Sequence, residues 1–158
     1  MVKVGIYGGS GYTGQELLRL LIGHPEADVA VITSRKFKDT PVSEVYPSFA
    51  GMTDLSFVDS FPETLVSSCD VVFLALPHGR SQRMVEEVES GGPELVVDTA
   101  ADFRLADRSR AEAVYGDHGA PHLLGSFACG LADVEGAALE GSRRVAVPGC
   151  FATAALLA

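Results

Sequence analysis

Four glycines gathered in one short segment, Gly8–Gly14, follow the first apolar run of the chain. That run, Val2–Tyr7, is rich in β-branched residues and is typical of a buried strand, while Thr13–Ile22 has the spacing of an amphipathic helix. Glycines at positions 8, 11 and 14 permit a sharp turn and the close approach of a pyrophosphate, which the free N–H groups of a helix start attract. A glycine-rich turn that serves packing alone is the alternative, but the strand–turn–helix context favours a dinucleotide site.

The form of the dinucleotide depends on the residues after the second strand. Dinucleotide domains that bind NAD commonly place a carboxylate there, about 20 residues beyond the glycines, to accept the ribose 2′-OH. Here the apolar run ends in Thr33, Ser34, Arg35 and Lys36, with no carboxylate. The planar guanidinium of Arg35 suits a 2′-phosphate, and Ser34 can donate a further hydrogen bond. A solvated basic loop is the alternative. We expect NADP(H).

Cys150 follows a strand-like run and a Pro-Gly step, and it lies at the start of a new helical pattern. A free thiol with a pKa of about 8.5 is only about 3% ionised at pH 7. Because a helix N-terminus favours negative charge, this position is expected to raise the thiolate fraction and make Cys150 a nucleophile. Cysteines more often serve only packing, and we adopt that interpretation for Cys69 and Cys129.

The elements that must position these residues alternate between strand and helix, which indicates an α/β fold: a Rossmann, doubly wound parallel sheet. Strands are predicted over Val2–Tyr7, Val29–Thr33, Val71–Leu76, Leu95–Asp98 and Arg143–Val147, with Leu55–Val58 as a weaker candidate. Helices are predicted over Thr13–Ile22, Ser81–Ser90, Ala106–Tyr115 and from Cys150 onward. The segment Lys36–Gly51 is predicted to be a surface loop.

Composition restricts the class of partner. The chain has 158 residues, suited to one domain, and its net charge of −9 argues against nucleic acid as a partner. Neither a signal peptide nor an uncharged membrane-spanning stretch is found, so no membrane partner is expected. Three widely spaced cysteines indicate reduced thiols in the cytoplasm and have no metal-ligand spacing, so no metal site is expected.

The last residues suggest how the chain is divided. Residues 1–149 are predicted to form the NADP-binding Rossmann domain, and residues 150–158 the start of the cysteine helix. This final stretch is apolar and has no helix stop signal. We therefore expect a fragment, or a remnant of a larger protein, whose second domain lies downstream.

Several segments together carry a resemblance to a known family. They are Gly8–Gly14, Thr33–Arg35, Ala75–Gly79, Asp98–Arg104 and Pro148–Ala154. The chain resembles the N-acetyl-gamma-glutamyl-phosphate reductases of arginine biosynthesis, part of the wider group of semialdehyde dehydrogenases, over essentially its whole length. One departure is Cys129–Asp133, where the family usually has Tyr-Gly-Leu-Pro-Glu.

The resemblance implies a mechanism. Cys150 attacks an acyl phosphate to form a thioester, which NADPH reduces to N-acetyl-glutamate 5-semialdehyde. It also implies a small-molecule acyl-phosphate substrate, a homo-oligomer at full length, and an acid/base histidine in the second domain. The expected cofactor-binding residues are Gly8, Ser10, Gly11, Tyr12, Thr13, Gly14, Ser34, Arg35, Leu76 and Pro77.

Other polar residues leave alternatives open. His78 either lines the cofactor or substrate pocket or is a turn residue bonded to nearby backbone. Arg104 and Asp102 either shape the substrate pocket or form a structural salt bridge. The chain's other histidines are predicted to be solvated: His24, His118 and His122.

Two further functions stay open as well. One is a stand-alone NADP(H)-binding module in which Cys150 only packs. The other is a reductase of aminoadipyl phosphate in lysine biosynthesis, because residues that tell the two substrates apart are expected partly outside this chain.

Overall fold

The computed structural model describes residues 1–59 and 67–158. Within these residues, six strands form one sheet in the order β2-β1-β3-β4-β6-β5, and every pair of neighbours is parallel. The strands are β1 (Val2–Tyr7), β2 (Ala27–Ile32), β3 (Val71–Leu74), β4 (Leu95–Asp98), β5 (Ala128–Cys129) and β6 (Arg144–Ala146). The predicted α/β class and doubly wound parallel sheet are confirmed.

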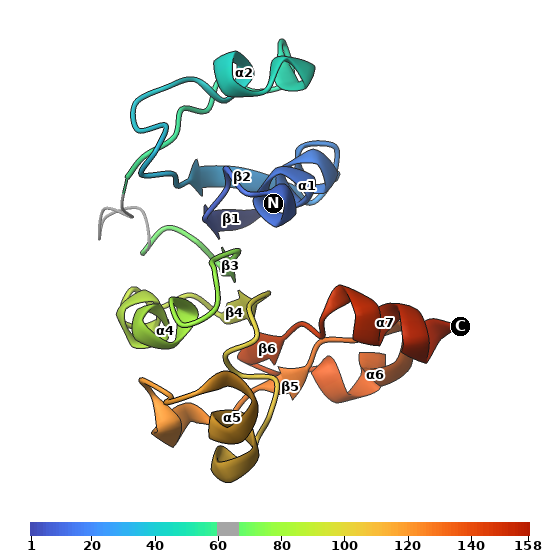
Figure 1. Cartoon of the computed structure of the whole chain (residues 1–158). Coiled ribbons are helices and arrows are strands. Elements are labelled where there is room, and N and C mark those ends of the chain that lie inside the picture. Colours follow the sequence, from blue (N-terminus) through green and yellow to red (C-terminus); the bar gives the residue numbers. More distant parts are fainter. Residues whose placement is uncertain (60–66) are drawn as a thin grey trace.

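Helices cover both faces of this sheet (Figure 1). Helices α1, α6 and α7 lie on one side and α4 on the other, while α2 lies beyond the edge strand β2. The helices are α1 (Tyr12–Ile22), α2 (Val42–Val45), α4 (Ser81–Ser90), α5 (Arg108–Tyr115), α6 (Ala132–Leu139) and α7 (Cys150–Leu157), with short 3-10 turns η1 (Pro47–Phe49) and η2 (Pro121–Leu123).

Two apolar clusters fill the space between helices and sheet. On the α1 side, Leu18 of α1 packs with Ile6 and Ile32, and none of the three is exposed. On the α4 side, Val85 and Val88 pack against the other face of the strands. These clusters fix the strand ends, and with them the loops that follow each strand.

Two connecting segments differ from the predictions. Lys36–Gly51 was predicted to be a surface loop, which is wrong: it contains α2 and η1, and Val42 and Phe49 are buried against the α1-side cluster. Leu55–Val58 forms no ladder strand and makes only isolated bridges at Ser56 and Val58. The segment is nevertheless packed into the core, because Phe57 is 0% exposed.

Three further differences concern the second half of the chain and the strand lengths. The strand β5 and the helix α6 were not predicted. Predicted strands that ended at Leu76 and Val147 stop earlier, at Leu74 and Ala146.

Within residues 1–59 and 67–158, no helix is both long and apolar enough to cross a membrane.

Candidate dinucleotide-binding site

The strand order reverses direction between β1 and β3, since β1 connects onward to the outer strand β2 while the later strands lie on the other side. In open α/β sheets, ligands bind outside the carboxyl ends of the strands at such a reversal. The loop Gly8–Gly11 leaves β1 at this point and leads into α1. The fold thus places the predicted glycine segment where a dinucleotide binds in this architecture.

Glycine is required at Gly8 and Gly14 for different physical reasons. Gly8 has a φ of +79°, and a Cβ there would lie 2.2 Å from the carbonyl oxygen of Ala75. At Gly14 a Cβ would lie 2.5 Å from both the Gly8 oxygen and the Gly9 Cα. Both positions therefore require glycine for turning and packing.

Gly11 is different. Its φ of −85° suits any residue, and the nearest described atom to a Cβ at this position, the Gly8 oxygen, would be 3.6 Å away. Neither backbone strain nor packing within the described residues explains the missing side chain. A ligand that approaches the backbone closely at this position does explain it, so the loop fits a pyrophosphate.

The start of α1 supplies donors for such an anion. The first hydrogen bond of the helix runs from the Gln15 N–H to the Gly11 carbonyl, at 2.8 Å. The N–H groups of Tyr12, Thr13 and Gly14 precede it and have no intrahelical acceptor. Together with the positive end of the helix dipole, they form an anion-binding site.

Residues after β2 hold the loop in place. Thr33 accepts hydrogen bonds from the loop twice, from the Gly8 N–H to its hydroxyl at 3.0 Å and from the Gly9 N–H to its carbonyl at 2.9 Å. The hydroxyls of Ser10 and Ser34 lie 2.7 Å apart in a further hydrogen bond. Ser34 is buried, so its role here is partly to position the loop.

A cavity of about 540 Å³ opens between this loop, the end of β2 and the start of α4. Six of the ten predicted cofactor residues line it: Gly8, Ser10, Ser34, Arg35, Leu76 and Pro77. The other four, Gly11, Tyr12, Thr13 and Gly14, lie at the start of α1 beside it. The structure therefore brings the ten residues to one region.

The cavity also contains residues that the sequence analysis did not single out. They are Tyr7, Thr33, Lys36, Asp59, Arg80, Arg83, Met84 and Glu87. The sequence could have indicated Arg80 and Arg83 as candidate cofactor residues. The bounds of α4 were predicted correctly, and both arginines lie at the start of this helix, close after the end of β3. Burial raises the pKa of Tyr7, with the Glu87 carboxylate as a smaller cause, so the phenol stays protonated.

Two carboxylates, Asp59 and Glu87, line this cavity although none follows β2 directly. Asp59 arrives from a distant segment, which the Thr33–Val58 bridge holds beside the end of β2. Lys38 forms an ion pair with Asp59 at 2.9 Å. Because this pair offsets the negative charge, Asp59 does not reverse the basic character that Arg35 and Lys36 give to the cavity.

Asp102 organises the loop after β3. Its carboxylate accepts hydrogen bonds from the backbone N–H groups of Gly79, at 2.8 Å, and Gln82, at 3.3 Å. It also pairs with His78 Nδ1 at 2.6 Å, and the Asp102 side chain is 0% exposed. The second nitrogen of His78 lies 3.3 Å from the Tyr115 carbonyl oxygen. These contacts match the open alternative in which His78 is a turn residue.

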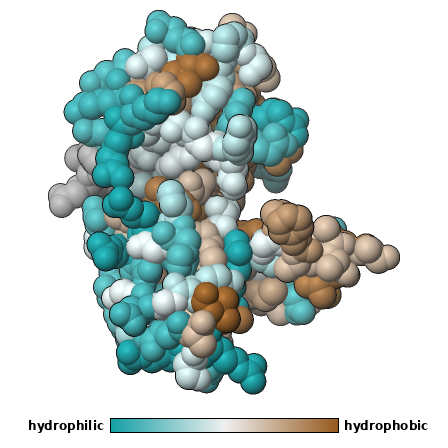
Figure 2. Space-filling model, in the orientation of Figure 1, coloured by the Kyte–Doolittle hydropathy of each residue, from teal (hydrophilic) through white to brown (hydrophobic). Residues whose placement is uncertain are grey.

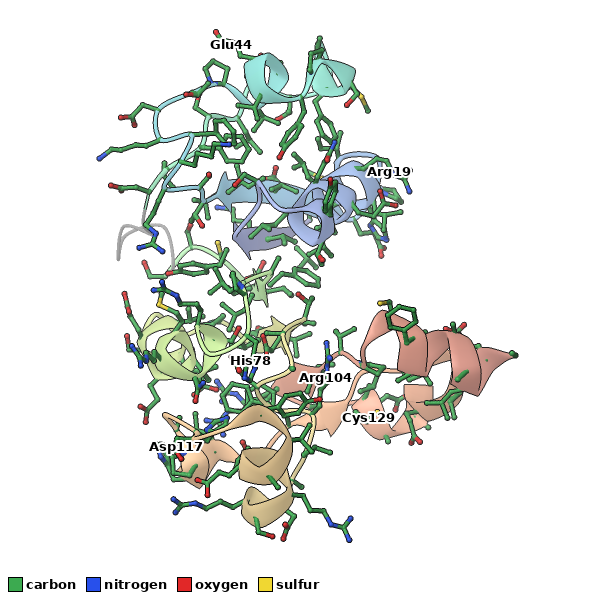
Figure 3. The ribbon with its side chains drawn as sticks, in the orientation of Figure 1. Arg19, Glu44, His78, Arg104, Asp117 and Cys129 are labelled. Carbon is green, nitrogen blue, oxygen red and sulfur yellow. The ribbon has the colours of Figure 1, made fainter. Side chains whose placement is uncertain are left out.

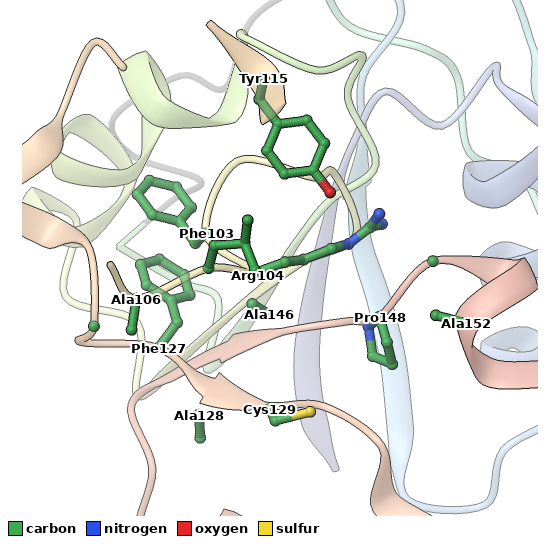
Figure 4. Close-up of a pocket in the computed structure, with 13 residues that line it drawn as sticks. Phe103, Arg104, Ala106, Tyr115, Phe127, Ala128, Cys129, Ala146, Pro148 and Ala152 are labelled. Atoms are coloured by element: carbon green, nitrogen blue, oxygen red, sulfur yellow. The ribbon is translucent and has the colours of Figure 1, made fainter. Parts of the chain in front are cut away.

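Arg104 does not form the structural salt bridge to Asp102 considered above. Its Nε donates to the Val147 carbonyl at 2.8 Å and its Nη2 to the Thr99 carbonyl at 2.9 Å. The guanidinium extends toward the segment that begins α7 (Figure 4), and a Cβ on Gly149 would lie 3.0 Å from its Nη1. Arg104 therefore adjoins Gly149, the residue before Cys150, whereas Cys150 itself does not line the cavity that contains Arg104.

Cys150 is the first residue of α7 and is exposed. A second cavity, of about 320 Å³, lies between Arg104 and this helix start, with Tyr115, Phe127 and Cys129 on its walls. The interpretation of Cys129 as a packing residue is wrong, because the residue is exposed. Figure 3 labels its position on the ribbon. Cys69 is buried as expected.

The histidines predicted to be solvated divide in two. His24 and His122 are exposed, and His122 pairs with Glu86 at 2.9 Å. His118 is a correction: it is half-buried, its Nε2 lies 2.9 Å from the Asp102 carbonyl oxygen, and its ring stands edge-on to Phe103. It stiffens the loop after β4.

Comparison with known proteins agrees with this geometry. Residues 3–141 match the family model described as semialdehyde dehydrogenase, NAD binding domain. N-acetyl-gamma-glutamyl-phosphate reductase of Saccharophagus degradans is 46% identical over 97% of this chain and 44% of its own length. The reductases of the same name from Nitrosococcus oceani and Pseudomonas savastanoi are 44% and 48% identical over 99% of this chain, and over 46% of their own lengths. The chain thus spans about half the length of these curated relatives.

Solved structures of lower identity share the fold. Aspartate semialdehyde dehydrogenase II of Vibrio cholerae has a TM-score of 0.68 at 14% identity, over 98% of this chain and 44% of its own. The enzyme of Candida albicans, solved with NADP, has a TM-score of 0.58 at 17% identity, over 97% of this chain and 44% of its own. The predictions of a Rossmann-type dinucleotide domain and of its family are confirmed.

Proposed function

Because the chain belongs to the family of semialdehyde dehydrogenase NAD-binding domains, we propose that it is the NADP(H)-binding part of an N-acetyl-gamma-glutamyl-phosphate reductase of arginine biosynthesis. Curated relatives with that name, 44–48% identical over nearly the whole chain, favour this substrate over aminoadipyl phosphate. We also propose that the full-length enzyme lies in the cytoplasm and forms a homo-oligomer.

The observation that carries the cofactor assignment is the distribution of charge. The chain has a net charge of −9, yet four of its 12 lysine and arginine residues line the cavity next to the glycine loop. Such a local concentration of cations in an acidic protein suits a phosphate-bearing ligand. Arg35 and Lys36, directly after β2, are proposed to bind the 2′-phosphate that distinguishes NADP(H) from NAD(H).

The proposed chemistry begins at Cys150. Its sulfur attacks the γ-carbonyl carbon of the acyl phosphate, the bond from that carbon to the phosphate oxygen breaks, and phosphate leaves with the electron pair. The thiol proton passes to solvent, and the acyl group remains on Cys150 as a thioester. When bound, NADPH would supply the hydride to this thioester. The bond from the acyl carbon to the Cys150 sulfur then breaks, and the sulfur leaves with the electron pair, so the aldehyde is released and the Cys150 thiolate is restored.

Arg104 is proposed to orient the substrate for this attack. Two of its nitrogens are fixed by the carbonyls of Val147 and Thr99, so the guanidinium is held rigidly beside the start of α7. A guanidinium in this position can bind the phosphate that departs and stabilise its charge. Because His78 pairs with Asp102, we treat it as part of the loop structure and propose no chemical step for it.

The domain division is part of the proposal. Residues 1–149 are proposed to form the cofactor domain, and residues 150–158 to begin the connection to a substrate domain. Two observations support this: the relatives are about twice as long as the aligned part, and α7 has no buried residue.

A mass measurement tests the nucleophile. The chain is incubated with N-acetyl-gamma-glutamyl phosphate, and intact-mass and peptide analysis locate any acyl adduct. We expect one adduct, at Cys150, with an equal amount of phosphate released, and none in Cys150→Ser. The matched control is Cys129→Ser, because Cys129 is also an exposed thiol and its removal is expected to leave the adduct unchanged. An adduct at Cys129, or none in the wild type, would contradict the assignment.

A further inference from the structure

The helix α4 forms one wall of the cofactor cavity. It contributes Arg80, Arg83, Met84 and Glu87, which are separated by three, four and seven positions. Residues with this spacing lie on one face of a helix. The opposite face, with Val85 and Val88, is buried in the core. The cavity-facing side of α4 therefore presents two guanidinium groups from its first turn.

Arg80 and Arg83 lie at the N-terminal end of α4, where positive charge is electrostatically unfavourable. The N-terminus of a helix carries partial positive charge and favours acidic residues, whereas α4 has none in its first turn. Arg80 is the N-cap residue and makes no side-chain capping bond. Local helix stability does not explain two cations there.

Intramolecular ion pairs do not explain them either. Three other arginines, Arg19, Arg108 and Arg144, pair with glutamates at 2.5–2.8 Å. Among residues 1–59 and 67–158, neither Arg80 nor Arg83 makes an ion pair or a side-chain hydrogen bond, and both are exposed toward the cavity. Arg80 and Arg83 thus line one cavity together with Arg35 and Lys36. These four cations outnumber the two carboxylates of the lining, Asp59 and Glu87, and Asp59 already pairs with Lys38, so the cavity favours an anion.

We propose that Arg80 and Arg83 bind the 2′-phosphate of NADP(H) from the α4 side, so that the phosphate is held between them and Arg35. This inference rests on the proposed cofactor function and extends it to a specificity determinant on a second element. The apolar residues Leu76, Pro77 and Met84 line the same cavity and offer a surface for the adenine ring. Removing either arginine is therefore expected to weaken binding of 2′-phosphorylated ligands selectively.

Calorimetry with two ligand pairs tests this. Arg80→Met and Arg83→Met remove the charge but keep an apolar stem. Each variant is titrated with NADPH and NADH, and with adenosine 2′,5′-bisphosphate and adenosine 5′-monophosphate. We expect the affinity for the two 2′-phosphorylated ligands to fall about tenfold, as for the loss of one charge-assisted contact, and the affinity for the other two to change less than about twofold. The control is Arg110→Met, an exposed arginine of α5 outside the cavity.

The outcomes separate this inference from the proposed function. Equal losses for phosphorylated and unphosphorylated ligands would assign the arginines to a group that both ligands share, such as the adenine or the 5′-phosphate, and unchanged affinities would assign them no role; either result overturns the inference. Arg35→Ala is the reference, since it is expected to weaken NADPH far more than NADH. If Arg35→Ala behaves so while Arg80→Met and Arg83→Met do not, the cofactor function stands and only the inference fails. If the wild type shows no preference for NADPH, the cofactor proposal itself fails.

Discussion

Asp98 places a carboxyl group in the interior at the end of β4, where it is 0% exposed. Its Oδ1 accepts a hydrogen bond from the Ala100 N–H at 3.1 Å, but its Oδ2 has no partner among residues 1–59 and 67–158. Burial raises the pKa of Asp98 to about 6, and the hydrogen bond from the Ala100 N–H offsets this only in part. The folded chain therefore binds this proton more tightly than the unfolded chain, in which an aspartate has a pKa of about 3.9.

The sign of the resulting pH dependence is the reverse of that for a salt-bridged aspartate. Below about pH 4 the group is protonated in both states and costs nothing. As the pH rises from about 4 to about 6, the unfolded chain releases this proton while the folded chain still holds it, so the free energy of unfolding falls; above about 6 both states are ionised and the fall ends. Since a tenfold change in proton affinity corresponds to about 1.4 kcal/mol, the loss is at most about 3 kcal/mol.

Asp98→Asn is expected to remove this loss. The amide carries no charge, and the unpartnered Ser81 hydroxyl is available to it as an acceptor. We expect denaturant unfolding to give a similar stability at about pH 4 and a higher stability than the wild type at about pH 8. Asp107→Asn is the control, because hydrogen bonds from Ser109 and the Arg110 N–H lower the pKa of Asp107, and its loss should lower stability at neutral pH. Parallel curves for wild type and Asp98→Asn would contradict the burial argument.

At the scale of single residues, the sequence could predict types but not partners. The motif around Arg104 identified it as a candidate for the substrate pocket or for a salt bridge to Asp102. Choosing between them depended on Val147, which is 43 positions away and accepts the Arg104 hydrogen bond. Likewise, the exposure of Cys129 depends on how β5 meets β6, which no local pattern reveals.

At the scale of elements, prediction succeeded where the apolar pattern matches the burial. The bounds of β1, β4 and α4 agree with the prediction at both ends, because the two strands are continuous apolar runs buried over consecutive residues and α4 buries residues at helical spacing. The helix α6 has no buried residue and is kinked at Glu135, so it carries no amphipathic signal. The strand β5 has only two residues, too few to show alternation.

The segment of α2 and η1, which its polar composition led us to predict as a loop, contains the partly buried Tyr46. Its Tyr46 ring packs edge-on to Phe49 and Phe57, and its hydroxyl donates to the Ser10 carbonyl at 2.7 Å. This contact fixes the peptide unit between Ser10 and Gly11, the point where the missing Cβ admits a ligand. We therefore regard Tyr46 as a positioning residue for the dinucleotide loop.

Tyr46→Phe tests that role. The variant keeps the ring packing and loses one hydroxyl-to-carbonyl bond, so the free energy of unfolding is expected to fall by about 1 kcal/mol. NADPH and NADH affinities are expected to fall together, several-fold, because the pyrophosphate is common to both. The control Ser90→Ala removes a hydroxyl-to-carbonyl bond of the same length, 2.7 Å, at the far end of α4. If Tyr46→Phe lost stability but kept both affinities, Tyr46 would be structural only.

At the scale of the whole molecule, apolar surface gathers on one projecting region of the face that Figure 2 shows. Figure 2 shows a hydrophobic projection on the side where Figure 1 places α6 and α7. It includes Val134, Phe151, Leu156 and Leu157, which are 50–89% exposed. Monomeric proteins rarely leave such residues contiguous unless another surface covers them. The proposed substrate domain, or a second chain, is expected to cover this projection.

The isolated chain is therefore expected to associate through this projection. Phe151 is 89% exposed and Leu156 66%, and covering each such side chain is worth about 1.5–3 kcal/mol. The double variant Phe151→Ser, Leu156→Ser is expected to move the onset of association, measured by light scattering, to at least about tenfold higher concentration. The matched control is Leu20→Ser, because Leu20 of α1 is also 55% exposed but lies outside the projection. A wild-type chain that remains monomeric at high concentration, or an equal effect of Leu20→Ser, would contradict this prediction. The association depends on contiguous apolar area and not on any single exposed leucine.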